Sequence, residues 1–383
     1  MLLTLRILLA VLASALCVCT LMPLIRTTQW WVRGFDFPRV QIVVIMVVVL
    51  LAQVGLGVLA YRQSGGPAPS LASLVSRAII PTLLVIALGW QVFRIFPYTP
   101  LAPVQMERSR DPSNEESIRL LIFNVRYDSR ESLALLRLID EKRPDVVLLA
   151  EPTHWWKDQL EALQDEYPHT VLQPQENHYG MLLYSRLELI NPRVRFLVED
   201  EVPSIDTEIR LRSGETLSFR GLHPKPPGLK RPSETEREDS GQRDAELITV
   251  AKEIKQARDA GRDTPTIVAG DFNDVAWSHT TRLFRRVSGL LDPRIGRGLY
   301  NSFSAESRVY RFPIDHVFAS EHFRLMGMEV LPGIGSDHHP VIVTLSLEPS
   351  APATQAKPDP QGDDLEEAEE TIENGKEEAR QGS

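Results

Sequence analysis

Three long apolar stretches without charged residues dominate the first quarter of the chain, and arginines bound each of them. The stretches cover residues 7–25, 40–61 and 78–93. Because an α-helix rises about 1.5 Å per residue, about 20 apolar residues cross the ~30 Å hydrocarbon core of a bilayer. The third stretch reaches this length if Arg94 extends its charged end toward the headgroups. The pattern predicts three transmembrane helices, at about residues 5–25, 40–61 and 78–96, and hence a membrane anchor over residues 1–96.

Two alternatives stay open for parts of this region. The first stretch could be a cleavable signal peptide, because Ala13, Ser14 and Ala15 form a small-residue pattern typical of a cleavage site. The third could be a buried or interfacial helix, because it is short and contains Pro81. The second stretch predicts an anchor under either alternative, since a soluble domain does not expose so long a span of Val, Ile and Leu.

A polar segment with four prolines, residues 97–117, separates this anchor from the rest and predicts a stiff linker. Beyond it, helices are predicted after Leu133 and over residues 245–260, where apolar residues recur at spacings of three and four. Short apolar runs typical of buried strands also occur. The predicted strands cover residues 120–125, 146–150, 181–184, 208–211, 216–222, 266–269, 309–318 and 341–347, with a hairpin turn at 212–215.

Strands and helices are mixed along this region rather than strictly alternating. That order favours a layered α/β or α+β architecture over a doubly wound parallel sheet. Residues 118–348 are long enough for one such domain. Residues 349–383 are rich in Pro, Ala and Gln and then in Glu, without apolar periodicity, so the pattern predicts a disordered acidic tail.

Charge is distributed unevenly over these parts. The chain has a formal net charge of −9, with seven Arg and one acid in residues 1–100 and ten acids and three bases in residues 349–383. Residues 101–348 therefore carry a net charge of −8. An acidic domain lacks the general attraction to phosphates that drives nucleic-acid binding, which disfavours a nucleic-acid partner. Both cysteines, Cys17 and Cys19, lie in the first apolar stretch, so the sequence predicts neither a disulfide framework nor a cysteine metal site.

Several polar residues stand where predicted strands begin or end, which is where a rigid sheet can hold side chains toward a ligand. They are Asn124, Glu151, His223, Asp271, Asn273, Asp315, Asp337 and His338. Each alone has an ordinary explanation as a turn former or a solvated group. Together they are the residue types that metal-assisted phosphate hydrolysis requires.

The chemistry assigns different tasks to these groups. A carboxylate such as Glu151 suits Mg²⁺, which prefers oxygen ligands, and a bound metal offsets the charge that develops on the phosphoryl group. His338 can exchange a proton near neutral pH if Asp315 or Asp337 orients its ring. Asn side chains offer uncharged donors to phosphoryl oxygens.

The order of these segments resembles that of the endonuclease/exonuclease/phosphatase superfamily. The matching segments are Ile122-Phe123-Asn124-Val125, Asp145 to Glu151, Gly221-Leu222-His223-Pro224, Gly270-Asp271-Phe272-Asn273-Asp274, Ile314-Asp315-His316-Val317-Phe318 and Ser336-Asp337-His338-His339-Pro340-Val341. The resemblance covers residues 118–347 and implies a four-layer α/β/β/α sandwich with the site at one edge of two packed sheets.

The resemblance also implies a role for each residue. Glu151 would be the main ligand of Mg²⁺, or of Mn²⁺, with Asn124 and Asp337 in the metal shell. Asp271 would orient or activate the attacking water, and Asp315 would orient His338. Members of the superfamily differ in the general base, so Asp271 and His338 both remain candidates. His223 and Asn273 would hold phosphoryl oxygens.

The substrate is less constrained. The loop after His223 holds five basic and five acidic residues through Asp244, so it predicts neither a basic clamp nor an aromatic platform for a polynucleotide. A membrane anchor followed by this domain also resembles bacterial members linked to glycopeptide resistance. That likeness implies a lipid-linked or envelope phosphate ester as substrate. A Mg²⁺-dependent nuclease is the alternative, and a catalytically silent membrane scaffold is a remote one.

The side of the membrane on which the catalytic domain lies can also be inferred. An envelope substrate places the catalytic domain outside the cytoplasm, as part of a multi-pass protein of the cell membrane. The arginines that bound the apolar stretches mildly favour the reverse, because more of them lie on the side of the domain.

Overall fold

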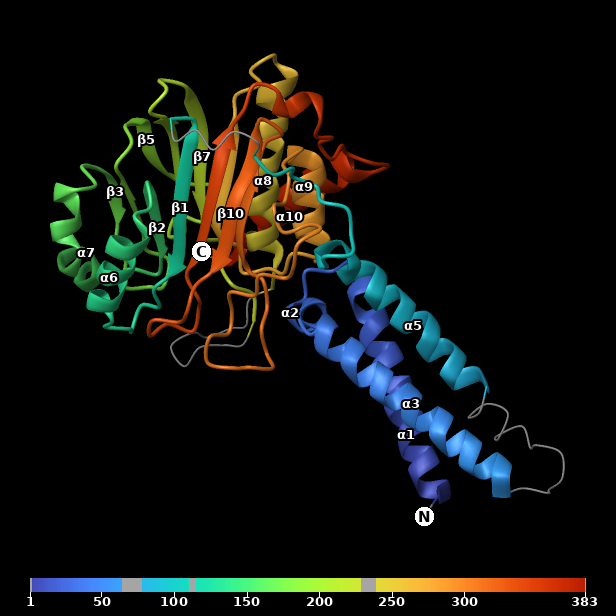
Figure 1. Ribbon diagram of the computed structural model, residues 1–383. Coiled ribbons are helices and arrows are strands. Elements are labelled where there is room, and N and C mark those ends of the chain that lie inside the picture. The colour runs from blue at the N-terminus through green and yellow to red at the C-terminus, as the bar shows by residue number, and fades with distance from the viewer. Residues whose placement is uncertain (1, 64–77, 110–114, 229–238, 383) are drawn as a thin grey trace. The chain divides into compact units, whose positions relative to one another are not determined.

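The computed structural model describes residues 2–63, 78–109, 115–228 and 239–382 (Figure 1). The chain divides into two compact units, Met1–Pro97 and Tyr98–Ser383. Each unit has its own hydrophobic core.

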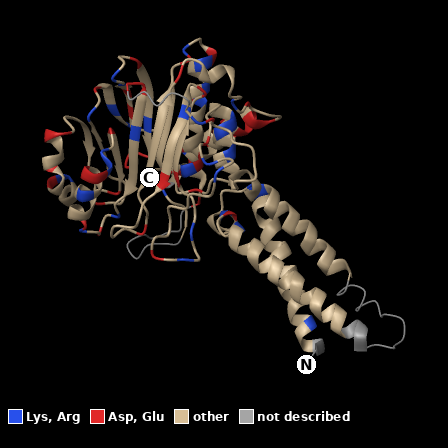
Figure 2. Ribbon diagram, viewed as in Figure 1, with Lys and Arg blue, Asp and Glu red and all other residues tan. Residues whose placement is uncertain are grey.

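The first unit is a bundle of the helices α1 (Leu2–Leu21), α3 (Arg39–Gln63) and α5 (Ile80–Ile95), with a short α2 (Trp30–Arg33) between the first two. Ala13, Met46 and Leu84 pack at its centre, whereas many of the other apolar side chains face outward. Charged residues are sparse along the bundle (Figure 2). Within the described residues, three helices are long and apolar enough to cross a membrane, as the hydrophobic pattern predicts.

A buried polar cluster joins these helices at one end of the bundle. The guanidinium of Arg39 donates to Gln91 Oε1 over 2.7 Å and to Asp36 Oδ1 over 2.7 Å. Gln91 Nε2 in turn donates to Thr20 Oγ1 over 3.1 Å. Because an unpaired charge in an apolar bundle is costly, this pairing ties α1, α3 and α5 to one another through specific partners.

The second unit contains two sheets. The first has the strand order β10 (Phe323–Val330), β11 (Val341–Leu347), β1 (Ser117–Asn124), β2 (Val146–Ala150), β4 (Met181–Ser185) and β3 (His169–Gln173). The second has the order β5 (Leu189–Phe196), β6 (Pro203–Arg210), β7 (Thr216–Leu222), β8 (Thr266–Asp271) and β9 (Asp315–Ala319). The pairs β1/β2 and β7/β8 are parallel, and the other neighbours are antiparallel.

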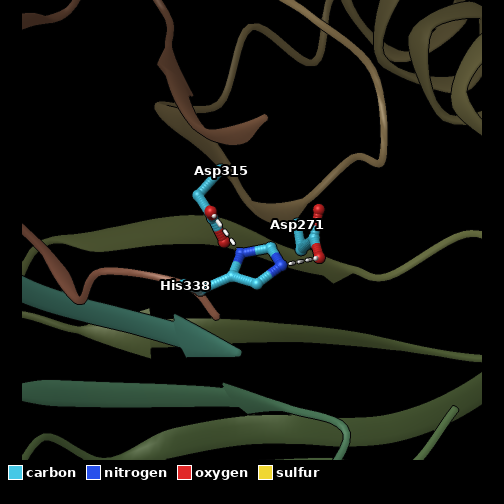
Figure 3. A group of neighbouring side chains, drawn as sticks. All are labelled: Asp271, Asp315 and His338. Carbon is cyan, nitrogen blue, oxygen red and sulfur yellow. Dashed lines mark hydrogen bonds and ion pairs between the residues drawn. The ribbon is translucent and has the colours of Figure 1, made fainter. Parts of the chain in front are cut away.

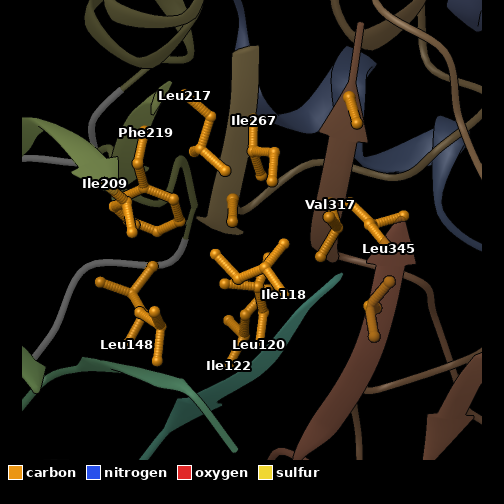
Figure 4. Close-up of a cluster of buried hydrophobic side chains, with 14 of the residues drawn as sticks. Ile118, Leu120, Ile122, Leu148, Ile209, Leu217, Phe219, Ile267, Val317 and Leu345 are labelled. Carbon is orange, nitrogen blue, oxygen red and sulfur yellow. The ribbon is translucent and has the colours of Figure 1, made fainter. Parts of the chain in front are cut away.

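Alternate residues of each strand enter different cores, because successive side chains of a strand point to opposite faces. On β1, Ile118, Leu120 and Ile122 face the second sheet, as Figure 4 shows for the core between the sheets. Leu121 and Phe123 face the opposite way, toward α6 (Ser132–Lys142) and α7 (His154–Gln159).

The second sheet is covered on its outer face by α8 (Gly241–Asp259) and α9 (His279–Ser288), which share a third cluster with β8 and β9. The layers are therefore helix, sheet, sheet and helix, and the predicted α/β/β/α sandwich is confirmed. Three strands were missed by the sequence pattern, namely β3, β5 and β10. Residues 309–314, predicted as the start of a strand, belong instead to a loop before β9.

The prediction of a disordered acidic tail is wrong. Asp364–Gly382 forms the helix α10, which packs on α8 and α9. Its Ala368 is buried in the outer cluster, and its acids pair with bases of the two helices beneath it. Arg286 holds the Asp364 carboxylate through two hydrogen bonds of 2.6 and 2.8 Å. The sequence pattern missed this helix because its apolar stripe is narrow and lies among many glutamates. The residues that the stripe contacts are far away in the sequence.

The segment predicted as an unpacked linker also contributes to the core. Tyr98, Ala102 and Met106 are buried, and the Tyr98 hydroxyl donates to the carbonyl of Ala276 over 2.6 Å. The catalytic unit thus begins about 20 residues before the predicted boundary, because apolar side chains between the prolines find a surface to cover.

Candidate active site

The strand directions bring the predicted residues to one edge of the two sheets. Asn124 ends β1 and Glu151 follows β2, and these strands are parallel. His223 follows β7 and Asp271 ends β8, the second parallel pair. Asp315 begins β9, where it lies opposite Asp271 in the antiparallel register.

The last two predicted residues, Asp337 and His338, lie at the same edge of the sheets. Asp337 and His338 precede β11, whose first residue lies opposite Ile122 near the end of β1. Ser336 anchors this turn, because its hydroxyl donates to the carbonyl of Asn124 over 2.7 Å and accepts from the backbone N–H of His338 over 3.1 Å.

A buried histidine lies between two carboxylates at the centre of this edge (Figure 3). His338 Nδ1 lies 2.8 Å from Asp315 Oδ2, and His338 Nε2 lies 3.6 Å from Asp271 Oδ2. Burial lowers the pKa of His338, but the charges of Asp315 and Asp271 outweigh it and raise that pKa to about 10. Burial and the charge of Asp315 raise the pKa of Asp271 to about 7, against the opposing charge of His338. His338 therefore stays protonated at neutral pH, whereas Asp271 gains and loses its proton in that range.

A second cluster adjoins the first through Asn124. Its side-chain nitrogen donates to Glu151 Oε1 and to Asp271 Oδ2, each over 3.0 Å. Burial raises the pKa of Glu151, but His178, His223 and the Asn124 amide outweigh it and lower that pKa to about 2. Glu151 is therefore an ionised carboxylate throughout the physiological range.

The turn after β8 is held by several backbone contacts. Asp271 Oδ1 accepts from the backbone N–H of Asn273 over 2.9 Å. The Asn273 side-chain nitrogen donates to the carbonyl of Pro224 over 3.0 Å, so this amide ties the turn to the segment after His223. Arg243, buried at the start of α8, donates to the carbonyl of Asn273 over 2.8 Å. The turn is thus fixed from both sides before any ligand binds.

The structure brings all eight predicted residues into this neighbourhood. His223 is buried, with Nε2 3.8 Å from Asp271 Oδ2. Burial raises the pKa of Asp337, although its neighbour His338 lowers it. Their assigned roles stay predictions, because proximity alone does not establish a role.

A match to a family model agrees with this geometry. The model described as endonuclease/exonuclease/phosphatase family matches residues 121–338, which is more than half of the chain. The chain belongs to this family. It is therefore a hydrolase of phosphoric ester bonds, and three long apolar helices precede its endonuclease/exonuclease/phosphatase domain.

Solved structures with a similar fold come from different organisms. They include D. rerio TDP2 in complex with a single-strand DNA product, at 16% identity and a TM-score of 0.48, covering 60% of this chain and 99% of that one. The catalytic domain of human nocturnin with a bound sulfate has 18% identity and a TM-score of 0.46, covering 65% and 98%. A family member from Bacteroides thetaiotaomicron has 18% identity and a TM-score of 0.47, covering 61% and 96%. Curated protein sequences contain no significant match.

Two residues near the site were missed by the sequence analysis. His178 precedes β4, with its Nδ1 3.6 Å from Glu151 Oε2, and its ring contacts that of Tyr127. Arg243 is the other. Neither belongs to a motif at a strand end, so only the folded chain reveals them.

The oxygen-rich cluster fits a divalent cation. Glu151 is ionised and its side chain keeps 13% of its surface exposed, so it can reach both a metal and its waters. Asp271, Asp315 and His338 also offer ligand atoms within 4.8 Å of one another. We favour the set around Glu151, because Asp315 already accepts the hydrogen bond of His338.

Proposed function

We propose that this chain is a Mg²⁺-dependent phosphoesterase that hydrolyses a lipid-linked or envelope phosphate ester. The observation that carries the proposal is the adjacency of an ionised Glu151 to the buried chain Asp315, His338 and Asp271, all at one sheet edge. The three apolar helices support a substrate confined to a membrane, because anchoring raises the local concentration of such a substrate.

In this proposal Glu151 would hold the metal, with Asn124 and Asp337 in its shell. Bound Mg²⁺, or Mn²⁺ in its place, would offset the charge of the phosphoryl group and polarise its oxygens. The Asn124 amide now spans Glu151 and Asp271, so it can orient both carboxylates. His223 lies buried beside Asp271 and can donate to a phosphoryl oxygen.

In the proposed reaction, Asp271 takes a proton from water and His338 supplies one to the leaving group. Asp271, with a pKa of about 7, accepts a proton from the attacking water. His338, with a pKa of about 10, starts protonated and gives its proton to the leaving-group oxygen. Asp315 acts as a positioning residue, because its hydrogen bond to Nδ1 leaves Nε2 directed toward Asp271. Asn273 positions the segment after His223 through Pro224, and from there it can also approach a phosphoryl oxygen.

The nuclease alternative has less support, because residues 101–348 carry a net charge of −8. Arg126, two residues after Asn124, is already paired with the acids Asp128 and Glu306, over 2.6 and 2.8 Å. A catalytically silent scaffold is disfavoured because the complete set of polar groups lies together at one edge of the sheets.

The test uses the full chain in proteoliposomes with Mg²⁺. A prenyl pyrophosphate, a phospholipid and single-stranded DNA are offered separately, and released phosphate or cleaved product is measured. We expect turnover of one lipid substrate, abolished by Asp271→Asn and retained in the control Asp263→Asn, whose exposed carboxylate lies outside the site. Asp271-dependent DNA cleavage without lipid turnover would replace the proposal with the nuclease. No turnover of any ester, with metal bound, would favour the scaffold.

We further propose an extracytoplasmic catalytic domain, as an envelope substrate requires. A reporter fused to the C-terminus tests this directly. A reporter active only in the cytoplasm would refute it, and the arginine distribution would then have indicated the correct side.

A further inference from the structure

The loop between Phe303 and Phe312 exposes two adjacent apolar side chains near the active site. Val309 and Tyr310 are 64% and 62% exposed. In the part of the catalytic unit that the structure describes, they are the only consecutive pair of large exposed hydrophobic residues. We call residues 308–311 the loop tip.

The base of this loop is attached to the catalytic residues. Phe303 and Phe312 pair through their backbones, and the ring of Phe303 lies 5.0 Å from that of His338. The backbone N–H of Ala305 donates to the carbonyl of Asp337 over 2.6 Å. Whatever the tip binds is therefore held close to the site.

Several backbone groups of the tip are already paired within the loop. The hydroxyl oxygen of Ser307 accepts from the N–H groups of Val309 and Tyr310 over 3.2 and 3.0 Å. Ser304 donates to the carbonyl of Tyr310, and Arg311 donates to that of Val309, each over 3.2 Å. In a low-dielectric medium, unpaired backbone groups are the main cost of burying a loop. This loop can bury its two side chains while leaving few polar groups of the tip unpaired.

Both charged residues of the loop tip are basic. Arg308 is exposed and Arg311 is partly exposed, and they flank the two apolar residues directly. Arg311 donates to the carbonyl of Ser307 over 2.8 Å, which keeps its side chain beside the tip. Aromatic and aliphatic residues between arginines match the boundary of a bilayer, where hydrocarbon meets anionic headgroups.

We propose that the loop tip inserts into the interface of an anionic lipid bilayer and thereby brings the catalytic site to a phosphate ester at that surface. The lipid contact follows from the loop itself. Its use in catalysis rests on the proposed function. A protein partner would instead need a complementary acidic groove.

The contact is tested with an environment-sensitive fluorophore on Tyr310→Cys, in the full chain with Cys17→Ser and Cys19→Ser. The protein is placed in vesicles of equal parts phosphatidylcholine and phosphatidylglycerol. We expect quenching by nitroxide-labelled lipids and protection from aqueous iodide. Phe196→Cys is the matched control, because Phe196 is also an exposed aromatic residue, at 45%, but lies on β5.

Equal iodide quenching at the two positions would overturn the proposal. So would lipid quenching that is the same in pure phosphatidylcholine and unchanged by Arg308→Ala with Arg311→Ala, since the arginines would then have no part in it. Protection from both quenchers would indicate a protein partner and would also overturn it.

Activity separates the two proposals. For Val309→Ser with Tyr310→Ser, we expect about tenfold lower turnover of the vesicle-borne ester, because the apolar contact is lost. Turnover of the soluble bis(p-nitrophenyl) phosphate should not change, and Phe196→Ser should leave both rates intact. An equal loss on both substrates would mean that the loop acts through His338 and not through lipid. If no lipid ester is hydrolysed while lipid quenching persists, the proposed function fails and the lipid contact stands.

Discussion

Gly270 occupies a position where a side chain has no space, directly before Asp271. Its φ is +143°, and a Cβ built on it would lie 1.9 Å from the carbonyl oxygen of Leu222 on the neighbouring parallel strand. Ordinary contacts between carbon and a carbonyl oxygen are about 3.3 Å or longer. Gly270→Ala therefore requires β7 and β8 to separate by more than about 1 Å at the residues that carry His223 and Asp271.

The loss of stability in Gly270→Ala has two components, which a control variant can separate. The backbone conformation disfavours any L-residue by about 1–3 kcal/mol, and forcing the strands apart adds about 1–3 kcal/mol. We expect Gly270→Ala to lose about 4 kcal/mol in free energy of unfolding, or about 10 °C in Tm for a unit of this size. Gly214→Ala supplies the control, because its φ is +92° but nothing lies within 4 Å of the added carbon. It should lose only about 1 kcal/mol.

The assay is thermal unfolding of the detergent-solubilised chain, followed by the fluorescence of the buried Trp156 and Trp277. Phosphoesterase activity is measured below the transition, where Gly270→Ala should be strongly impaired and Gly214→Ala should not. Equal losses of Tm in the two variants would refute the steric reasoning. Full activity in Gly270→Ala would show that Asp271 does not depend on the spacing of these strands.

Three further predictions concern charge and the C-terminal helix. Asp315→Asn removes a carboxylate that raises the pKa of His338, so the basic limb of the pH–rate profile should move to lower pH; an unmoved limb would contradict the assigned pairing. Truncation after residue 362 removes α10 and should lower Tm by several degrees, since Ala368 and the Arg286 ion pair are lost; an unchanged Tm would mean that the tail does not dock. Burial raises the pKa of Glu253, but two arginines lower it to about 2 from its ordinary 4.5. The advantage of the wild type over Glu253→Gln in urea unfolding should therefore be fully present above about pH 5, at about 2 kcal/mol after solvent screening, and fade as the pH falls toward 2. A pH-independent difference would rule this linkage out.

The local pattern of apolar and polar residues was sufficient to predict several strands and the position of the site. Short apolar runs predicted β1, β2, β7 and β8, and polar residues at the ends of those runs predicted the site. This works because the period of a strand and the residue that terminates it are both local properties. The three membrane-length helices followed from composition and length alone.

Other features depended on partners that are distant in the sequence. The sequence of the Glu-rich tail predicts disorder, because its local pattern does not show that Arg286 and Lys252 pair with its acids. The segment before β9 contains apolar residues that pattern alone assigned to a strand, although Val309 and Tyr310 face outward.

The active site, too, was determined partly by local sequence and partly by the tertiary structure. The sequence by itself determined which residue types stand at the strand ends, because these positions follow from local pattern. Only the tertiary structure decided that Asp315 holds His338 while Asn124 joins Glu151 to Asp271, and that His178 lies beside Glu151. The reason is physical: hydrogen bonds and shifted pKa values arise from distances between side chains, and those distances exist only after the two sheets pack.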